Sequence, residues 1–160
     1  MNERLSHTLK PVFDSDSRIL ILGSFPSAVS RKLNFYYANP TNRFWPVLSR
    51  VFDETIDDRR EFCLRRNIAL WDVIESCTIT GSSDSSIRDV KVNDIQSLIE
   101  QTKIHAVFTT GGKAASLYRR YVHADLQATA LPSTSAANAS MRLERLTEIY
   151  AILRETLEKD

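Results

Sequence analysis

Cysteine and histidine are scarce in this chain of 160 residues. The two cysteines, Cys63 and Cys77, do not form a CxxC pair, so they supply neither a four-thiolate zinc or iron–sulfur site nor a disulfide framework. We expect both to be reduced thiols of a cytosolic protein. His7, His105 and His123 are scattered along the chain, which argues against a histidine-based triad or metal site. The sequence therefore predicts neither a metal nor a cofactor.

Long hydrophobic runs and an excess of charge of one sign are also missing. No apolar run approaches the ~18 residues needed to span a bilayer, and residues 1–10 are polar and mixed in charge, unlike a secretory signal. The formal net charge is only +1, so binding to a polyanion would require a local basic patch. We expect a monomer of the cytoplasm, without membrane attachment and associated with the nucleoid if the source is bacterial.

Common phosphate-binding and nucleophile motifs are absent as well. Neither residues 23–27 (GSFPS) nor residues 111–113 (GGK) have the spacing of a phosphate-cradling P-loop. No GxSxG nucleophile elbow is present. An enzyme with this sequence would have to work without a metal, a nucleophilic thiol or a histidine base.

Short apolar runs alternate with amphipathic segments along the chain. Strands are predicted at residues 19–22, 68–74, 104–109 and 126–131. Helices are predicted at residues 42–52, 57–66, 92–101 and 113–121, with a last one after residue 139. Strands that are apolar on both faces and separated by helices indicate a mostly parallel sheet between helical layers. We predict an α/β fold: a three-layer α/β/α sandwich with a four-stranded sheet, in which residues 1–17 form an N-terminal arm and residues 18–160 a single domain.

Residues 18–45 concentrate the side chains of chemical interest. A buried strand ends at Gly23, and the long polar loop that follows carries three neighbouring aromatic residues, amides and cations. Flat rings beside amides and cations are suited to holding a nucleobase next to a phosphate. Parallel sheets bind ligands at the carboxyl ends of their strands. Four segments should therefore meet at one edge of the sheet: residues 23–27, 71–73, 109–112 and 131–139.

These segments are similar to the signature blocks of a known family. The blocks are ILGSFPS, FYYANPTNRFW, LWDVI with CTITGSSDSSI, and LPSTSAANA, in this order within about residues 18–139. They resemble the uracil-DNA glycosylase superfamily, in particular its DNA-deoxyinosine (hypoxanthine-DNA) glycosylase branch, which is related to the G:T/U mismatch-specific enzymes. The resemblance implies base flipping from double-stranded DNA and metal-independent hydrolysis of the N-glycosidic bond. The expected function is base excision repair of deaminated bases, hypoxanthine first and uracil second, by a monofunctional glycosylase.

The resemblance also implies roles for individual residues. Phe25 stands where the best-known members carry an Asp or Asn that positions the attacking water, and in the hypoxanthine branch an Asn takes over, which here is Asn39. An amide is a poor general base, so we expect modest turnover that depends on positioning and electrostatics. Tyr37 is expected to stack on the flipped base, and the backbone N–H groups of Ser24 and Phe25 to donate to it. From the residues alone, Asn39 is an Asn-Pro turn residue and the aromatic residues anchor the loop.

The expected site also includes residues that contact DNA and two alternative candidates for a catalytic carboxylate. Phosphate contacts are expected from Lys32, Arg43, Ser133, Thr134 and Ser135. Residues 136–138 lie where relatives push a wedge into the duplex, but their small side chains fill a gap poorly. Asp72 and Asp84 are the second choice as catalytic carboxylates, and Asp72, at a strand end, is more simply explained as an acceptor for loop amides.

Other functions stay open at this point. Phe25 cannot position water, so a catalytically silent nucleic-acid or nucleotide-binding module on the same fold is one alternative. A G:U/T mismatch-specific uracil glycosylase is another. Hydrolysis of free nucleosides or nucleotides is a third, and it would not need a duplex-wedging loop.

Overall fold

A four-stranded parallel sheet forms the centre of the protein. The computed structural model describes residues 3–80 and 86–159. The strands are β2 (Ile19–Gly23), β3 (Ile68–Asp72), β6 (Ala106–Thr110) and β7 (Ala128–Leu131). They lie in the order β3-β2-β6-β7, and every neighbouring pair is parallel. The predicted α/β fold with a four-stranded parallel sheet is confirmed.

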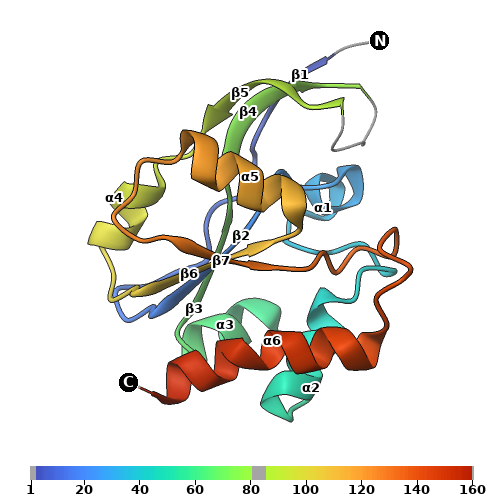
Figure 1. Cartoon of the computed structure of the whole chain (residues 1–160), viewed down its shortest axis with the longest axis vertical. Helices are drawn as coiled ribbons and strands as arrows, with labels where there is room; N and C mark the ends of the chain where they lie inside the picture. Colours follow the sequence, from blue (N-terminus) through green and yellow to red (C-terminus); the bar gives the residue numbers. More distant parts are fainter. Residues whose placement is uncertain (1–2, 81–85, 160) are drawn as a thin grey trace.

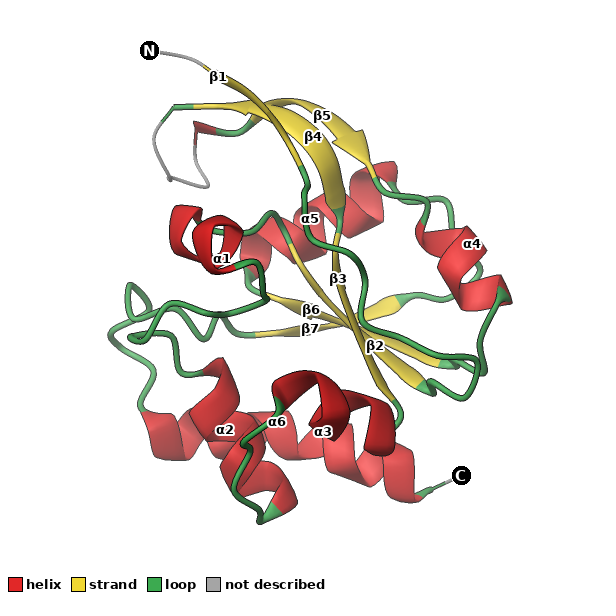
Figure 2. Cartoon of the chain, turned by 180° about the vertical axis from the view of Figure 1, so that it is seen from behind, coloured by secondary structure: helices red, strands yellow, loops and turns green. Residues whose placement is uncertain are grey.

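Helices cover both faces of this sheet (Figures 1 and 2). On one side lie α2 (Phe44–Phe52), α3 (Arg59–Arg65) and α6 (Leu143–Glu158), and on the other α1 (Ala28–Leu33), α4 (Ile95–Glu100) and α5 (Gly112–Tyr121). Successive side chains of a strand point to opposite faces. In β2, Ile19 and Ile21 therefore join the core under α2, α3 and α6, whereas Leu20 and Leu22 join the core under α4 and α5. Burial on both sides explains why this strand is a continuous apolar run.

A second sheet, which the sequence analysis did not predict, adjoins the first. It consists of β1 (Glu3–Ser6), β4 (Ile74–Ile79) and β5 (Arg88–Val92), paired antiparallel in the order β1-β4-β5. The single strand predicted over residues 68–74 is wrong, because the chain leaves the central sheet at Val73 and continues in β4. Residues 76–79, predicted as a connection, also belong to β4. Part of the predicted N-terminal arm is thus paired in this sheet.

Local side-chain bonds set the starts of two helices, α4 and α1. The helix predicted over residues 92–101 begins only at Ile95, and Asp94 caps it by accepting from Ser97 N–H at 3.1 Å. Helix α1 was not predicted, since its six residues are too few for a periodic pattern. Ser27 caps its start by accepting from Ser30 N–H. No helix in the described residues is long and apolar enough to cross a membrane.

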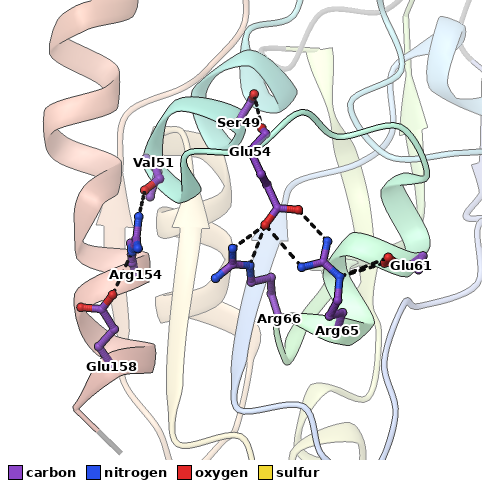
Figure 3. Close-up of polar contacts among 8 residues, drawn as sticks. All are labelled: Ser49, Val51, Glu54, Glu61, Arg65, Arg66, Arg154 and Glu158. Carbon is purple, nitrogen blue, oxygen red and sulfur yellow. Dashed lines mark hydrogen bonds and ion pairs between the residues drawn. The ribbon is translucent and has the colours of Figure 1, made fainter.

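An ion-pair cluster ties the segment after α2 to α3 (Figure 3). Glu54 pairs with Arg65 at 2.6 Å and also with Arg66. Hydrogen bonds from both guanidinium groups lower the pKa of Glu54 from its ordinary 4.5 to about 2. Nearby, Arg154 of α6 donates to the carbonyl of Val51 at 3.1 Å, which links α6 to α2. These contacts hold the helical layer on the face of the sheet that contains the larger core.

Candidate active site

A cavity of about 850 Å³ opens at the carboxyl ends of the central strands. Its walls come from the segments after β2, β3, β6 and β7, which the sequence analysis expected to meet at this edge. The volume lies in the range of pockets that bind small organic ligands. The residues that line it include Ser24, Phe25, Arg31, Tyr37, Asn39, Asp72 and Ser135.

The loop that carries the aromatic residues is anchored into the core beside this cavity. The Tyr36 hydroxyl is buried and donates to the carbonyl of Lys10 at 2.9 Å, and Trp45 Nε1 donates to the Tyr36 carbonyl at 3.1 Å. Phe35 stacks on Trp45 with ring centroids 6.0 Å apart. Phe35 and Tyr36 therefore fix the loop, and Tyr37 lines the cavity together with part of Tyr36.

Tyr37 is held in a restricted conformation. Its backbone φ is +52°, in the left-handed region that costs a non-glycine residue of the order of 1 kcal/mol. Its ring stacks on Phe44 with centroids 3.8 Å apart and planes 10° apart, and its hydroxyl shares a hydrogen bond with Thr110 Oγ1 at 2.9 Å. Burial, followed by the nearby charge of Asp72, raises the pKa of Tyr37, so the phenol stays neutral. A flat, uncharged ring is thus fixed in the cavity wall.

Asn39 lines the cavity, and its side chain also closes a local turn. Its Oδ1 accepts hydrogen bonds from the backbone N–H and the hydroxyl of Thr41, each at 2.9 Å. This is an Asx turn, as expected of an Asn-Pro segment. The backbone donor fixes which amide atom is oxygen, and Nδ2 has no hydrogen-bond partner within the described part of the chain. The amide is therefore presented to the cavity in one orientation.

Asp72, at the end of β3, is paired with a histidine from the N-terminal segment. His7 Nε2 donates to Asp72 Oδ2 at 2.8 Å, and the two side chains are 3% and 6% exposed. The prediction that Asp72 accepts from loop amides is wrong: within residues 3–80 and 86–159, His7 is the only donor to its carboxylate. Asp84, the other predicted carboxylate, lies outside the described residues.

Gly23 allows the Asp72 carboxylate to approach the backbone at the end of β2 closely. A Cβ atom at this glycine would come within 2.5 Å of Asp72 Oδ1 and 3.3 Å of the Tyr37 hydroxyl. The close approach requires a residue without a side chain. It also shows where the carboxylate lies: Oδ2 faces His7, and Oδ1 lies over Gly23 at the cavity wall.

The loop between β7 and α6 is organised by residues that were predicted to contact phosphates. Arg43 donates to the carbonyls of Ser135 at 2.8 Å, Asn138 at 3.1 Å and Met141. Thr134 is buried, and its hydroxyl donates to Asn42 Oδ1 at 2.8 Å. Both side chains therefore hold this loop, and their expected contacts with DNA phosphates stay a prediction.

The other predicted DNA contacts remain accessible. Ser133 and Ser135 line the cavity, while Lys32 is exposed at the surface of α1. Arg31, a cation beside the site loop in the sequence, lines the cavity with its guanidinium 5.7 Å from the centre of the Phe25 ring. None of its guanidinium N–H groups has a hydrogen-bond partner in the described chain, and Nε is buried. The Phe25 ring also packs edge-on against the His7 ring, with ring centroids 6.1 Å apart.

Comparison with known proteins identifies the family. The model of the family described as "Uracil DNA glycosylase superfamily" matches residues 10–155. The chain belongs to this superfamily.

Individual proteins of known name or structure are also similar to this chain. A hypoxanthine DNA glycosylase of Methanosarcina acetivorans is 34% identical over 149 residues, covering 89% of this chain and 94% of the relative. One of Methanosarcina barkeri is 32% identical over 134 residues, covering 80% and 85%. The solution NMR structure of a Methanosarcina acetivorans protein, described as a candidate uracil DNA glycosylase, superposes with a TM-score of 0.79 at 32% identity over 98% of this chain and 99% of that one. The resemblance seen in the sequence blocks is confirmed.

Proposed function

We propose that this superfamily member is a monofunctional, metal-independent DNA glycosylase of base excision repair that removes hypoxanthine, and more slowly uracil, from double-stranded DNA. The observation that carries the proposal is the cavity, where the Tyr37 ring, the Asn39 amide and the Asp72 carboxylate line one space at the strand ends. Two relatives that share about a third of its residues are named hypoxanthine DNA glycosylases, which supports the same substrate.

The cavity suits a base that has left the helical stack. Unstacking and unpairing a base costs a few kcal/mol, and stacking on an aromatic ring returns ~1–3 kcal/mol. Tyr37 is proposed to provide that ring, with Phe44 supporting its far face. Because the hydroxyl bond to Thr110 and the stacking on Phe44 already fix Tyr37, little entropy is lost when the base binds.

Asn39 is proposed to position the attacking water beneath C1′ of the sugar. The turn with Thr41 holds its amide rigidly, which favours precise placement of a bound water. An amide cannot take a proton at neutral pH, so the sugar must develop oxocarbenium character before water adds. No metal is assigned to this step, and the described residues contain no group of three or more His, Cys, Asp or Glu side chains that could bind one.

Abasic-site formation on duplexes that contain deoxyinosine, deoxyuridine, xanthine or a G:T mismatch tests the proposal. We expect excision of hypoxanthine first and uracil second. Folded protein that binds these duplexes but cleaves none of them would refute the enzymatic assignment.

Two variants of one residue test the role of Asn39. Asn39→Ala should slow single-turnover excision by about 100-fold while changing DNA affinity only a few-fold. Asn39→Asp keeps the acceptor for Thr41 and can still hold water through an oxygen, so it should retain much more activity than the alanine variant. Equal losses of cleavage and binding would remove Asn39 from the reaction.

The second candidate function is a catalytically silent nucleic-acid-binding module. Two observations favour it: Phe25 cannot hold water, and the Asn39 oxygen already accepts two hydrogen bonds. A gel shift without excision would support it. Excision of free deoxyinosine at the rate of the DNA substrate would instead indicate a nucleoside hydrolase.

A further inference from the structure

The Asp72 carboxylate in the cavity wall is held from outside the central sheet. Its only partner in the described chain, His7, follows strand β1 and lies 65 residues earlier in the sequence. We propose that His7 is a positioning residue, which fixes Asp72 so that Oδ1 accepts a hydrogen bond from an N–H of the flipped base. The inference deepens the proposed function and rests on it.

The His7 ring is itself immobilised. The backbone N–H of His7 donates to the carbonyl of Glu75 at 2.5 Å, so it continues the pairing of β1 with β4. The ring then contacts Phe25 edge-on at 6.1 Å and Tyr36 at 6.2 Å. A ring that lies against two aromatic neighbours and is only 3% exposed has little freedom to turn away from Asp72.

The carboxylate that it holds has one oxygen left for a ligand. Oδ2 receives the His7 bond, and Oδ1 lies over the end of β2, where a Cβ on Gly23 would come within 2.5 Å of it. No described residue donates to Oδ1, although Asp72 is only 4% exposed. This oxygen is not closed off inside the protein, so it can accept a hydrogen bond from water or from a ligand in the cavity.

An ionised carboxylate can only accept hydrogen bonds, and this property matches the chemistry of deamination. Adenine N1 and cytosine N3 are acceptors. Deamination converts them to hypoxanthine N1–H and uracil N3–H, which are donors. A fixed acceptor therefore binds hypoxanthine and uracil and meets a lone pair on adenine and cytosine, the bases from which they form; guanine N1–H and thymine N3–H are donors, so this contact does not reject those two bases. Sites built to hydrogen-bond a substrate N–H reject analogues that lack it by as much as ~10⁴–10⁵-fold.

Through its contact with Asp72, His7 helps to determine which base is excised, although His7 itself does not touch the base. Without His7, no described side chain holds the orientation of the carboxylate, and Asp72 is free to rotate about its own bonds. The acceptor would then be misplaced by about 1 Å or more, which is enough to cost ~100-fold in rate. Discrimination should fall with it, because a mobile carboxylate can turn away from the lone pair of the wrong base.

Single-turnover excision from three duplexes tests the inference. They carry deoxyinosine, 1-methyldeoxyinosine, in which a methyl group replaces the N1 hydrogen, or deoxyadenosine. The wild-type protein should excise hypoxanthine at least 100-fold faster than either of the others. In His7→Ala this ratio should fall at least tenfold, and His7→Gln, whose amide can still donate to Asp72, should restore much of it. His123→Ala, an exposed histidine outside the cavity, is the matched control and should leave the ratio unchanged.

The possible outcomes separate the two proposals. A His7 residue that served only folding would lower the fraction of active protein, and hence the reaction amplitude, but not the ratio of rates. An unchanged ratio in His7→Ala would overturn the inference and leave the glycosylase assignment intact. If His7→Ala does not fold, equal excision of hypoxanthine and 1-methylhypoxanthine by the wild type would overturn it without any variant. Failure of the wild type to excise hypoxanthine would refute both proposals.

Discussion

A single methyl group on Gly23 should disable the site. In Gly23→Ala the new Cβ would lie 2.5 Å from Asp72 Oδ1, about 0.9 Å short of the 3.4 Å at which ordinary contact begins. The carboxylate must retreat by that distance, but His7 holds its other oxygen at 2.8 Å. Either the His7 bond breaks or β2 and β3 move apart.

The size of the effect follows from this geometry. Loss of a buried hydrogen bond to a charged group should lower the free energy of unfolding by about 1–3 kcal/mol. A displacement of about 1 Å at a site that positions a substrate should slow excision by about 100-fold. Urea denaturation and single-turnover excision of hypoxanthine measure the two effects separately.

Two comparisons decide whether the carboxylate is the cause. Gly112→Ala is the matched control for stability, since a Cβ there meets nothing within 4 Å, and it should leave the free energy of unfolding almost unchanged. In an Asp72→Ala background, Gly23→Ala should cost little more than Asp72→Ala alone, because the atom that it strikes is gone. Fully additive losses in the double variant would refute the reasoning.

Three further predictions concern the scaffold. Arg43→Ala removes three hydrogen bonds to carbonyls of the β7–α6 loop and should lower the free energy of unfolding by about 2 kcal/mol in urea, whereas Arg50→Ala, on the exposed side of α2, should not. The pKa of Glu54 is lowered to about 2 in the folded protein, so its contribution to stability is present above pH 4.5 and lost as the pH falls toward 2. In denaturation curves, Glu54→Gln should be less stable than the wild type at pH 6 and equal to it near pH 2. A difference in stability that does not change with pH would contradict this. Burial raises the pKa of Cys63 to about 12 and also raises that of Cys77, so neither thiol should be alkylated at pH 8 until the protein is unfolded, as mass spectrometry after iodoacetamide treatment can check.

The central sheet could be predicted because its strands carry their own signal. Burial on both faces makes β2 apolar at every position, and the helices of the larger core repeat their apolar residues at helical spacing. The second sheet gave no such signal. Strand β1 has four residues, β4 is rich in polar side chains, and the register that pairs Ser6 with Ser76 is set by contacts between distant segments.

In the candidate site, too, residues whose position depends on local sequence could be predicted, and residues whose position depends on distant contacts could not. Tyr37 and Asn39 stand together in one loop, and their place at the cavity follows from the strand that precedes them. The His7–Asp72 pair could not be predicted, because it exists only when β1 is placed on β4, and that sheet was not expected. Arg43 shows a similar limit: the sequence shows a cation near the site but not that three carbonyls of another loop point at it.

The pairing of β1 with β4 has a practical consequence for anyone who produces this protein. Residues 3–7 pair with β4 and carry the His7 bond to Asp72. An affinity tag fused next to them, or protease trimming through residue 7, would therefore disturb or remove that bond in the recombinant protein. A tag after α6, whose last turn lies at the far side of the fold from β1 (Figure 1), leaves that bond untouched. Preparations tagged at opposite ends should therefore differ in specific activity, even when their melting curves coincide.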